Sequence, residues 1–266
     1  MASTIRRALA AATIVALLSL PARADYEAGK AAFEAGDFAA AQRELLPLAD
    51  DPRAAFYLGI MAERGWGMIA DQQAAVAFYR SAVAGGHVQA MVNLGVMVDQ
   101  GRGIRPSGLV AQDLFLAAVR AGDARGRNDL AFLWARQGGL LEEALCLSSQ
   151  ALQVEPHHGG YLDVHGFILQ RLGRSAEARR FFELALGQSS NDDFALEQLG
   201  DLAYARNDQA TARRYWQRAL AATRTVVDAD RLRDKLGGWY RNPLPHSEFE
   251  FKNEDGFGAD CNRQTS

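Results

Sequence analysis

Apolar residues recur every three or four positions along most of the chain, which is the spacing of one face of an α-helix. In the stretch SAEARRFFELAL the repeating positions are Ala178, Phe181, Phe182, Ala185 and Leu186. No stretch before residue 245 shows the strict alternation that is typical of a half-buried strand. The pattern predicts an almost entirely α-helical fold.

The helical pattern itself repeats at fixed spacings. Residues 58–68 (LGIMAERGWGM) match residues 94–104 (LGVMVDQGRGI) at a spacing of 36, and later units repeat at a spacing of 34. A unit of this length that carries two helices buries its apolar face by stacking on its neighbours. The sequence therefore predicts a right-handed α-solenoid of about six antiparallel helix pairs. We place the pairs at about 25–49, 54–85, 90–121, 127–153, 160–187 and 193–222.

Small and large residues occupy matched places in these units. On each first helix a glycine is expected where the two backbones approach most closely, and the large residues Phe182 and Trp216 fill the space between units. The glycines are Gly29, Gly59, Gly95, Gly166 and Gly200. The spacing changes from 36 to 34 near residues 130–132, so the register of the fourth pair is ambiguous by one residue.

Residues with cap chemistry stand between the predicted helices. Asp37, Asp71 and Asp208 precede second helices and can accept hydrogen bonds from the exposed amides there. Gly36, Gly101 and Gly173 follow first helices, where a left-handed residue is commonly needed. After the solenoid at 25–222, a capping helix (VVDADRLRDKL, 226–236) is predicted within 223–238, and we expect the tail at 239–266 to be disordered.

The first residues have the layout of a secretory signal peptide. Arg6 and Arg7 precede an apolar run, and Ala22-Arg23-Ala24 is a small-x-small cleavage site. We predict cleavage after Ala24, which leaves a periplasmic or secreted mature chain. No later segment is apolar and long enough to be expected to span a membrane.

Charge and cysteine content narrow the partner classes. Loss of three arginines with the signal peptide moves the formal charge from −3 to about −6, so the basic footprint of a nucleic-acid binder is missing. Two cysteines, Cys146 and Cys261, are too few for a fold held by disulfides. Export permits a bond between them, and the sequence leaves that pairing open.

The repeats carry a family resemblance. The middle units resemble Sel-one-like repeats, and residues 127–222 resemble tetratricopeptide repeats, as does the first pair. The Sel-one-like positions are Ala54, Tyr57-Leu58-Gly59, Gly65-x-Gly67, Asp71, Ala75, Tyr79, Ala82 and Gly86, and the tetratricopeptide ones include Gly166, Gly200, Pro156, Ala178, Ala185, Ala212 and Ala219. The resemblance implies a scaffold that holds a protein or peptide in a concave groove. One exported Cys-rich branch of the Sel-one-like proteins is linked to penicillin binding, but this chain lacks its cysteine pairs and has no Ser-x-x-Lys.

Three motifs invite a chemical interpretation. Gly65-x-Gly67 lacks the third glycine and the preceding strand of a dinucleotide loop, so a turn between helices is favoured. His157, His158 and His165, near Asp163, lack zinc-like spacing, so we predict no metal and no cofactor. Arg179-Arg180 and Arg213-Arg214 predict a basic ridge or, more simply, a solvated outer face. No catalytic set is found, and we predict a protein that is not an enzyme.

The remaining candidates lie on the concave row, formed by the first helix of each pair. The positions expected to be exposed there, and to bind a protein or peptide partner, are Phe33, Glu63, Asp99, Arg136, Asp163, Phe167, Gln170, Arg171, Glu197, Asp201 and Tyr204. Two alternatives stay open at this point. One is a role in binding or hydrolysing peptidoglycan or a β-lactam, and the other is an adaptor that binds through its tail.

Overall fold

The structure, a computed structural model, describes residues 25–238. The predicted signal peptide, the predicted tail and Cys261 lie outside these residues. Within them the chain forms α-helices and one short 3-10 helix, without a strand. The prediction of an all-α fold is confirmed.

The helices follow one another with short connections. In order they are α2 (Tyr26–Glu34), α3 (Phe38–Leu45), η1 (Leu46–Leu48), α4 (Pro52–Arg64), α5 (Gln72–Ala84), α6 (Val88–Gln100), α7 (Gly108–Arg120), α8 (Ala124–Gln137), α9 (Leu141–Val154), α10 (Gly159–Arg171), α11 (Ser175–Gln188), α12 (Asp193–Ala205), α13 (Gln209–Ala222) and α14 (Val226–Leu236). Each predicted pair corresponds to two of these helices, and the predicted capping helix is α14.

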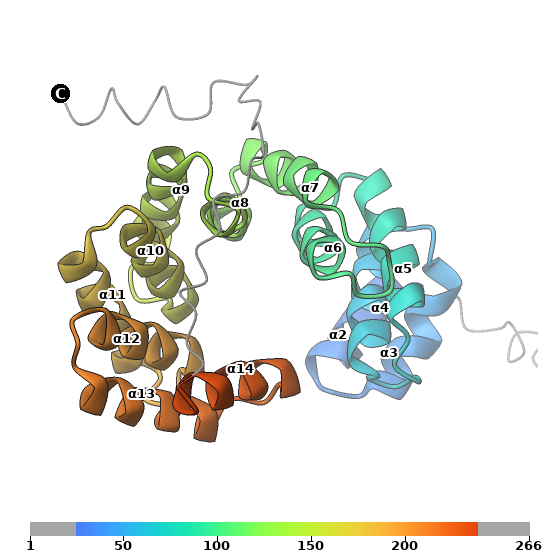
Figure 1. The fold of residues 1–266 in the computed structure, drawn as a ribbon. Helices are drawn as coiled ribbons and strands as arrows, with labels where there is room; N and C mark the ends of the chain where they lie inside the picture. The colour runs from blue at the N-terminus through green and yellow to red at the C-terminus, as the bar shows by residue number, and fades with distance from the viewer. Residues whose placement is uncertain (1–24, 239–266) are drawn as a thin grey trace, which may run out of the picture. The chain divides into compact units, whose positions relative to one another are not determined.

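The chain divides into two compact units after Pro106. Unit 1 holds α2 to α6, and unit 2 holds α7 to α14 (Figure 1). The third predicted pair is thus split, since α6 belongs to unit 1 and α7 to unit 2. Each unit is described by itself below.

Helix pairs build the core of unit 1. Helix α2 packs on α3 and α4 on α5, and α4 also contacts both helices of the first pair. Ala41, Leu45, Leu58 and Met61 are fully buried between them. Gly59 has no room for a side chain, because an added Cβ would lie 2.5 Å from the Tyr79 ring. The close approach predicted for this glycine is confirmed.

The two Gly-x-Gly stretches are turns that pack against the preceding helix pair. Gly65 ends α4 with a φ of 73°, a left-handed conformation that favours glycine. Gly67 also has a positive φ, and a Cβ there would lie 2.5 Å from the carbonyl oxygen of Phe38. A Cβ on Gly103 would lie 2.2 Å from the carbonyl oxygen of Gln72. Backbone contact therefore requires the second glycine, and the predicted role as a turn is confirmed.

The residue between the glycines also reaches back toward the preceding pair. Trp66 stacks on Phe38 with ring centroids 4.8 Å apart and lies 6.0 Å from the Phe33 ring. In the next copy, Arg102 Nη1 donates to Glu63 Oε1 at 2.7 Å. In both copies the side chain between the glycines points toward the preceding helix pair. Trp66 makes an aromatic contact there, and Arg102 makes an ion pair.

Unit 2 has an inner row and an outer row of helices. Helices α8, α10 and α12 form the inner row, α9, α11 and α13 form the outer row, and α14 packs on α13 at the end (Figure 1). Phe182 and Trp216, from the outer row, are buried against glycines of the inner row. A Cβ on Gly200 would lie 2.4 Å from the Trp216 ring. This complementarity of small and large residues fixes each pair at its observed distance.

Aspartates begin many of the helices, as the sequence predicts. Asp37 accepts from the amide of Ala40, Asp71 from that of Gln73, and Asp208 from that of Thr211, at distances of 2.9–3.0 Å. Such caps satisfy amides that have no partner inside the helix.

Candidate partner-binding face

The inner row of unit 2 presents equivalent residues at regular places. Residues five, nine and thirteen of a helix lie on one side, because four residues span slightly more than one turn. These places hold Asn128, Phe132 and Arg136 on α8, Asp163, Phe167 and Arg171 on α10, and Glu197, Asp201 and Ala205 on α12. We call this side of α8, α10 and α12 the inner face.

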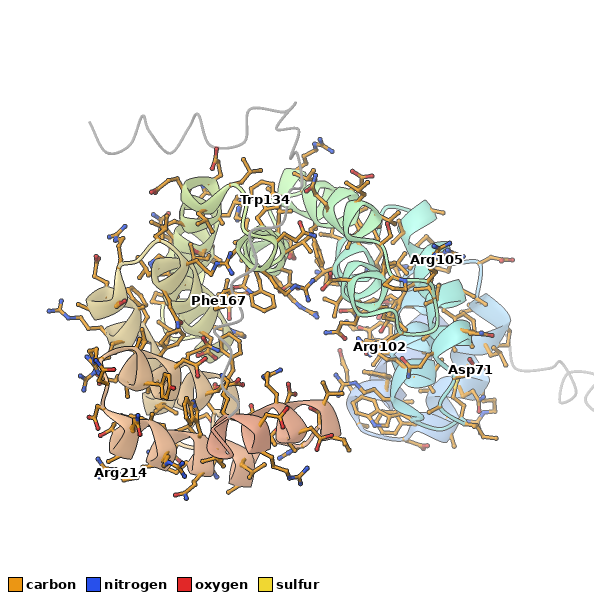
Figure 2. All side chains as sticks on the ribbon, in the orientation of Figure 1. Asp71, Arg102, Arg105, Trp134, Phe167 and Arg214 are labelled. Atoms are coloured by element: carbon orange, nitrogen blue, oxygen red, sulfur yellow. The ribbon has the colours of Figure 1, made fainter. Side chains whose placement is uncertain are left out.

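Three phenylalanines, one from each helix of the inner row, meet at the inner face. The ring centroids of Phe132 and Phe167 are 5.6 Å apart. The ring centroid of Phe194, the second residue of α12, lies 6.1 Å from that of Phe132 and 5.9 Å from that of Phe167. All three side chains are half-buried. Phe167 is labelled on α10 in Figure 2. The cluster is therefore an aromatic surface that is still accessible.

Polar groups flank this aromatic cluster on the side of the helix C-termini. Arg136 lies over the Phe132 ring, with its guanidinium carbon 5.8 Å from the centroid. Partial burial lowers the pKa of Arg171, and within the described residues it has no ion pair. The side-chain oxygen of Gln170 is buried without a hydrogen-bond partner. This side of the inner face therefore carries two guanidinium groups and, at Gln170, an acceptor without a hydrogen-bond partner.

Asp163 flanks the cluster on the opposite side, one turn before Phe167. It is only 6% exposed, and its Oδ1 has no hydrogen-bond partner. Burial raises the pKa of Asp163 to about 9, and the nearby carboxylates of Asp192 and Asp193 contribute to the same shift. Asp192 is itself fixed, since it caps α12 by accepting from the amide of Ala195 at 3.0 Å. Asp163 therefore carries a proton near neutral pH.

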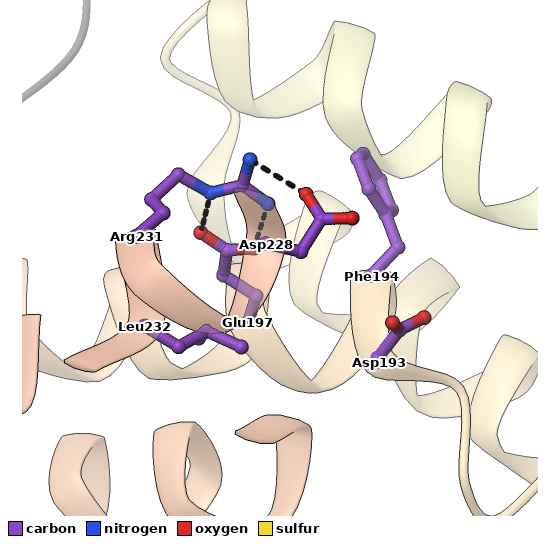
Figure 3. A pocket seen from close by; sticks show the side chains of 6 residues that line it. All are labelled: Asp193, Phe194, Glu197, Asp228, Arg231 and Leu232. Atoms are coloured by element: carbon purple, nitrogen blue, oxygen red, sulfur yellow. Dashed lines mark hydrogen bonds and ion pairs between the residues drawn. The ribbon is translucent and has the colours of Figure 1, made fainter. Parts of the chain in front are cut away.

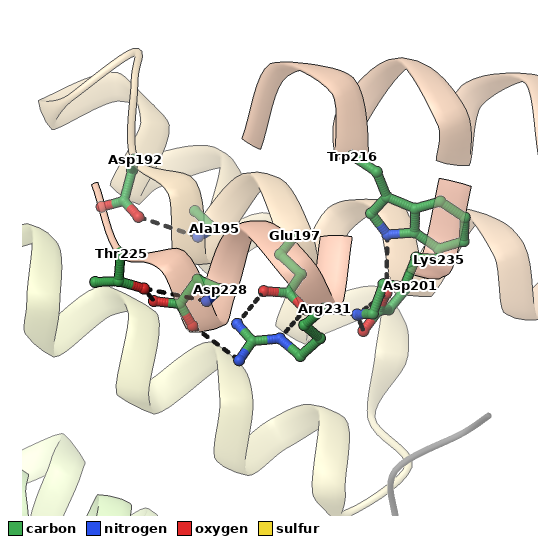
Figure 4. Close-up of polar contacts among 9 residues, drawn as sticks. All are labelled: Asp192, Ala195, Glu197, Asp201, Trp216, Thr225, Asp228, Arg231 and Lys235. Atoms are coloured by element: carbon green, nitrogen blue, oxygen red, sulfur yellow. Dashed lines mark hydrogen bonds and ion pairs between the residues drawn. The ribbon is translucent and has the colours of Figure 1, made fainter. Parts of the chain in front are cut away.

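Further along the inner row, α14 covers the carboxylates of α12. Lys235 Nζ lies 2.6 Å from Glu197 Oε1 and 2.7 Å from both carboxylate oxygens of Asp201. Arg231 donates twice to Glu197, at 2.8 and 2.6 Å, and Trp216 Nε1 donates to Asp201 (Figure 4). Burial alone would raise the pKa of Glu197, but the hydrogen bonds from Arg231 and Lys235 hold it below its usual range.

A small pocket lies where α12 meets α14. Its walls are Asp193, Phe194, Glu197, Asp228, Arg231 and Leu232 (Figure 3). Phe194 belongs both to this pocket and to the aromatic cluster, and Asp193 lies beside Asp163. The pocket therefore borders the aromatic cluster at Phe194.

Three predicted groove residues are not exposed. Asp163, Glu197 and Asp201 are 6%, 4% and 7% exposed, so the prediction that they face solvent is wrong. Glu197 and Asp201 are covered because α14 places Arg231 and Lys235 on them. Glu197 and Asp201 could therefore contact a partner only if α14 moved away from them.

The other predicted residues have varied surroundings. In unit 2, Phe167, Gln170 and Arg171 stand together on α10, Arg136 is exposed on α8, and Tyr204 packs on Trp216 at 5.6 Å. In unit 1, Phe33 packs on Phe38 and Tyr57, Glu63 accepts from Tyr79 and Arg102, and Asp99 is half-buried on α6. The binding role of all these positions stays a prediction.

The sequence reasoning did not select Phe132 and Phe194. At a spacing of 34, Phe132 aligns with Gly166 and is assigned to a packing position. In the structure it contacts Phe167, 35 residues later, which resolves the register of the fourth pair. The ambiguity near residues 130–132 was therefore the signal that could have found it.

The other motifs have structural explanations. His165 is buried, its Nδ1 lies 2.9 Å from Ser148 Oγ, and burial lowers its pKa to about 4. Within residues 25–238, no group of three or more His, Cys, Asp or Glu residues could hold a metal ion. Arg179 pairs with Glu183 on the exposed side of α11, and Arg214 contacts Thr211 on α13.

Comparison with solved structures shows the fold of this chain. No protein-family model matches it, and no curated protein matches it. Solved structures do, and they are helical-repeat proteins. A Sel1 repeat protein from Oxalobacter formigenes aligns over 91% of this chain and 100% of its own, with 20% identity and a TM-score of 0.56.

Two further solved structures align with this chain at similar TM-scores. A tetratricopeptide repeat protein from Parabacteroides merdae covers 80% of this chain and 84% of its own at 16% identity and a TM-score of 0.57. The pilF protein of Pseudomonas aeruginosa covers 79% of this chain and 95% of its own at 15% identity and a TM-score of 0.57. The chain therefore has the helical-repeat fold of the Sel1 and tetratricopeptide repeat proteins, as its sequence resemblance implied.

A helix that crosses a bilayer needs about 20 predominantly apolar residues. No helix within residues 25–238 is both long enough and apolar enough to cross a membrane.

Proposed function

We propose that this protein is a non-catalytic scaffold that binds a segment of another protein on the inner face of unit 2. The observation that carries the proposal is the contact of Phe132, Phe167 and Phe194, which come from the three helices of the inner row and are half-buried. Partly exposed aromatic side chains ringed by polar groups are typical anchor points of protein interfaces. The helical-repeat fold supports the proposal, because such folds present extended binding surfaces.

We place this activity in the periplasm or outside the cell. Support comes from the basic start, the apolar run and the small-x-small site within residues 1–24. N-terminal sequencing of the protein recovered from its host tests this, and a mature chain that still begins at Met1 contradicts it.

Peptide selection tests the binding role. Random twelve-residue peptides displayed on phage are selected on the mature chain, 25–266, and the enriched peptides are measured by fluorescence polarisation. Phe167→Ala should weaken their binding about tenfold or more, because an interface anchor is lost. Leu184→Ala is the matched control, since Leu184 is 53% exposed on α11 of the outer row.

Equal affinity of wild type and Phe167→Ala, with both folded by circular dichroism, would remove the inner face as the binding site. Turnover of muropeptides or a β-lactam by the purified chain would instead show that the protein is an enzyme.

A further inference from the structure

Asp163 is a buried acid with unused hydrogen-bonding capacity. Its side chain is 94% buried, its Oδ1 accepts no hydrogen bond, and the carboxyl groups nearby are those of Asp192 and Asp193. Burial of an acceptor without a donor costs free energy. Asp163 lies on the same side of α10 as Phe167, one turn away, but it is 94% buried. The unpartnered Oδ1 therefore lies beneath the inner face, and a partner's cation reaches it only if the side chains around it move aside.

The protein already satisfies the equivalent acid one repeat later. Glu197 lies 34 residues after Asp163, and both are the fifth residue of an inner-row helix. Arg231 and Lys235 of α14 reach Glu197 with contacts of 2.6–2.8 Å. Two cations from a separate helix thus complete the carboxylate on α12, while the described residues offer none to the one on α10.

We infer that the inner face binds a peptide segment that places a lysine or arginine against Asp163 and an apolar side chain on the phenylalanine cluster. In this arrangement the partner repeats on α10 what α14 does on α12. The inference rests on the proposed function and adds the chemical class of the partner.

The local charge favours a cation. Three carboxyl groups stand together, and the N-terminus of α12 supplies only about half a positive charge. Asp163 now avoids unfavourable ionisation by holding a proton, so an arriving ammonium or guanidinium would displace that proton and form an ion pair. Binding of the cation should therefore release a proton at neutral pH.

Distance sets where the basic residue stands in the peptide. Asp163 and Phe167 are separated by four residues, or about 6 Å along the helix. An extended peptide advances about 3.3 Å per residue. The basic residue should therefore stand within about two residues of the apolar anchor.

The selection described above tests this inference when it is repeated on Asp163→Asn. Peptides enriched on wild type should carry lysine or arginine within two residues of an aromatic or aliphatic residue. Asp163→Asn should weaken their binding about tenfold, and changing the peptide's basic residue to norleucine should have a similar effect. Asp113→Asn, at an exposed position on α7, is the matched control and should not alter affinity.

Calorimetry gives an independent readout. Titration of the best peptide in phosphate and in Tris at pH 7 should show release of about one proton from wild type and almost none from Asp163→Asn. Wild-type binding without proton release would contradict the inference.

The outcomes separate the two proposals. If affinity depends on Phe167 but neither on Asp163 nor on the peptide's basic residue, the cation preference is overturned and the proposed function stands. If no selected peptide depends on Phe167, both are overturned.

Discussion

Asp163→Asn should make the isolated protein more stable. In the folded chain the pKa of Asp163 is raised to about 9 from an ordinary 3.8, because burial and the neighbouring Asp192 and Asp193 disfavour its ionised form. Unfolding at pH 7 exposes a carboxyl group that ionises freely, and this favours the unfolded state. The difference between pH 7 and 3.8 corresponds to about 4 kcal/mol as an upper limit.

Asparagine resembles the protonated acid in shape and cannot ionise. Its amide can still donate to Asp192, and its oxygen keeps the place of the unpartnered Oδ1. We therefore expect a gain of about 1–3 kcal/mol in the free energy of unfolding at pH 7. Because the folded pKa is raised, the contribution of Asp163 to stability is fully present below about pH 4 and is lost as the pH rises toward 9.

Urea unfolding at pH 4.5, 7.0 and 8.5 measures this difference. Far-ultraviolet circular dichroism follows the whole chain, and hydrogen exchange of α10 peptides reports on unit 2 by itself. The advantage of Asp163→Asn over wild type should grow with pH and should fall at pH 4.5 to about a quarter of its value at pH 7. A variant that is less stable at pH 7, or an advantage that does not change with pH, would refute the reasoning. Asp113→Asn should stay within about 0.5 kcal/mol of wild type.

Three further predictions concern the packing of unit 2. Lys235→Met leaves two buried carboxylates without their shared cation and should cost about 3–5 kcal/mol, seen as faster hydrogen exchange in α14; Arg233→Met, at an exposed position, is the control and should change little. Gly200→Ala should lower the free energy of unfolding by about 1–3 kcal/mol, because the new Cβ would meet the Trp216 ring. Gly187→Ala should be neutral or stabilising, because the space around Gly187 is open. Equal effects of the two substitutions would contradict this account. Burial lowers the pKa of His165 to about 4 and keeps the side chain neutral. The contribution of His165 to the free energy of unfolding is therefore fully present above about pH 6.5 and should fall by up to about 3 kcal/mol as the pH drops to 4. In urea titrations, His165→Gln should remove this pH dependence.

The stability of Asp163→Asn and its affinity for basic peptides are expected to change in opposite directions. A buried acid that is kept to bind a partner's cation lowers the stability of the unbound protein. Measuring both properties on one variant therefore distinguishes a binding residue from a poorly packed one.

The sequence by itself determined the local structure. Helical periodicity, aspartate caps and glycines at 34- and 36-residue spacings predicted the helices, their pairing within a repeat and the capping helix. These features depend on residues close in sequence or on one repeated contact, such as that of Gly200 with Trp216. A pattern that recurs is therefore enough to reveal them.

Only the tertiary structure decided which inner-face residues are accessible. The sequence could place Glu197 and Asp201 on the inner side of their helix, but it could not show that α14 covers them with Arg231 and Lys235. Nor could it join Phe132 to Phe167, because one residue of register separates a packing position from an exposed one. Helix position determines where a side chain points, whereas burial and charge pairing depend on what distant segments bring to it.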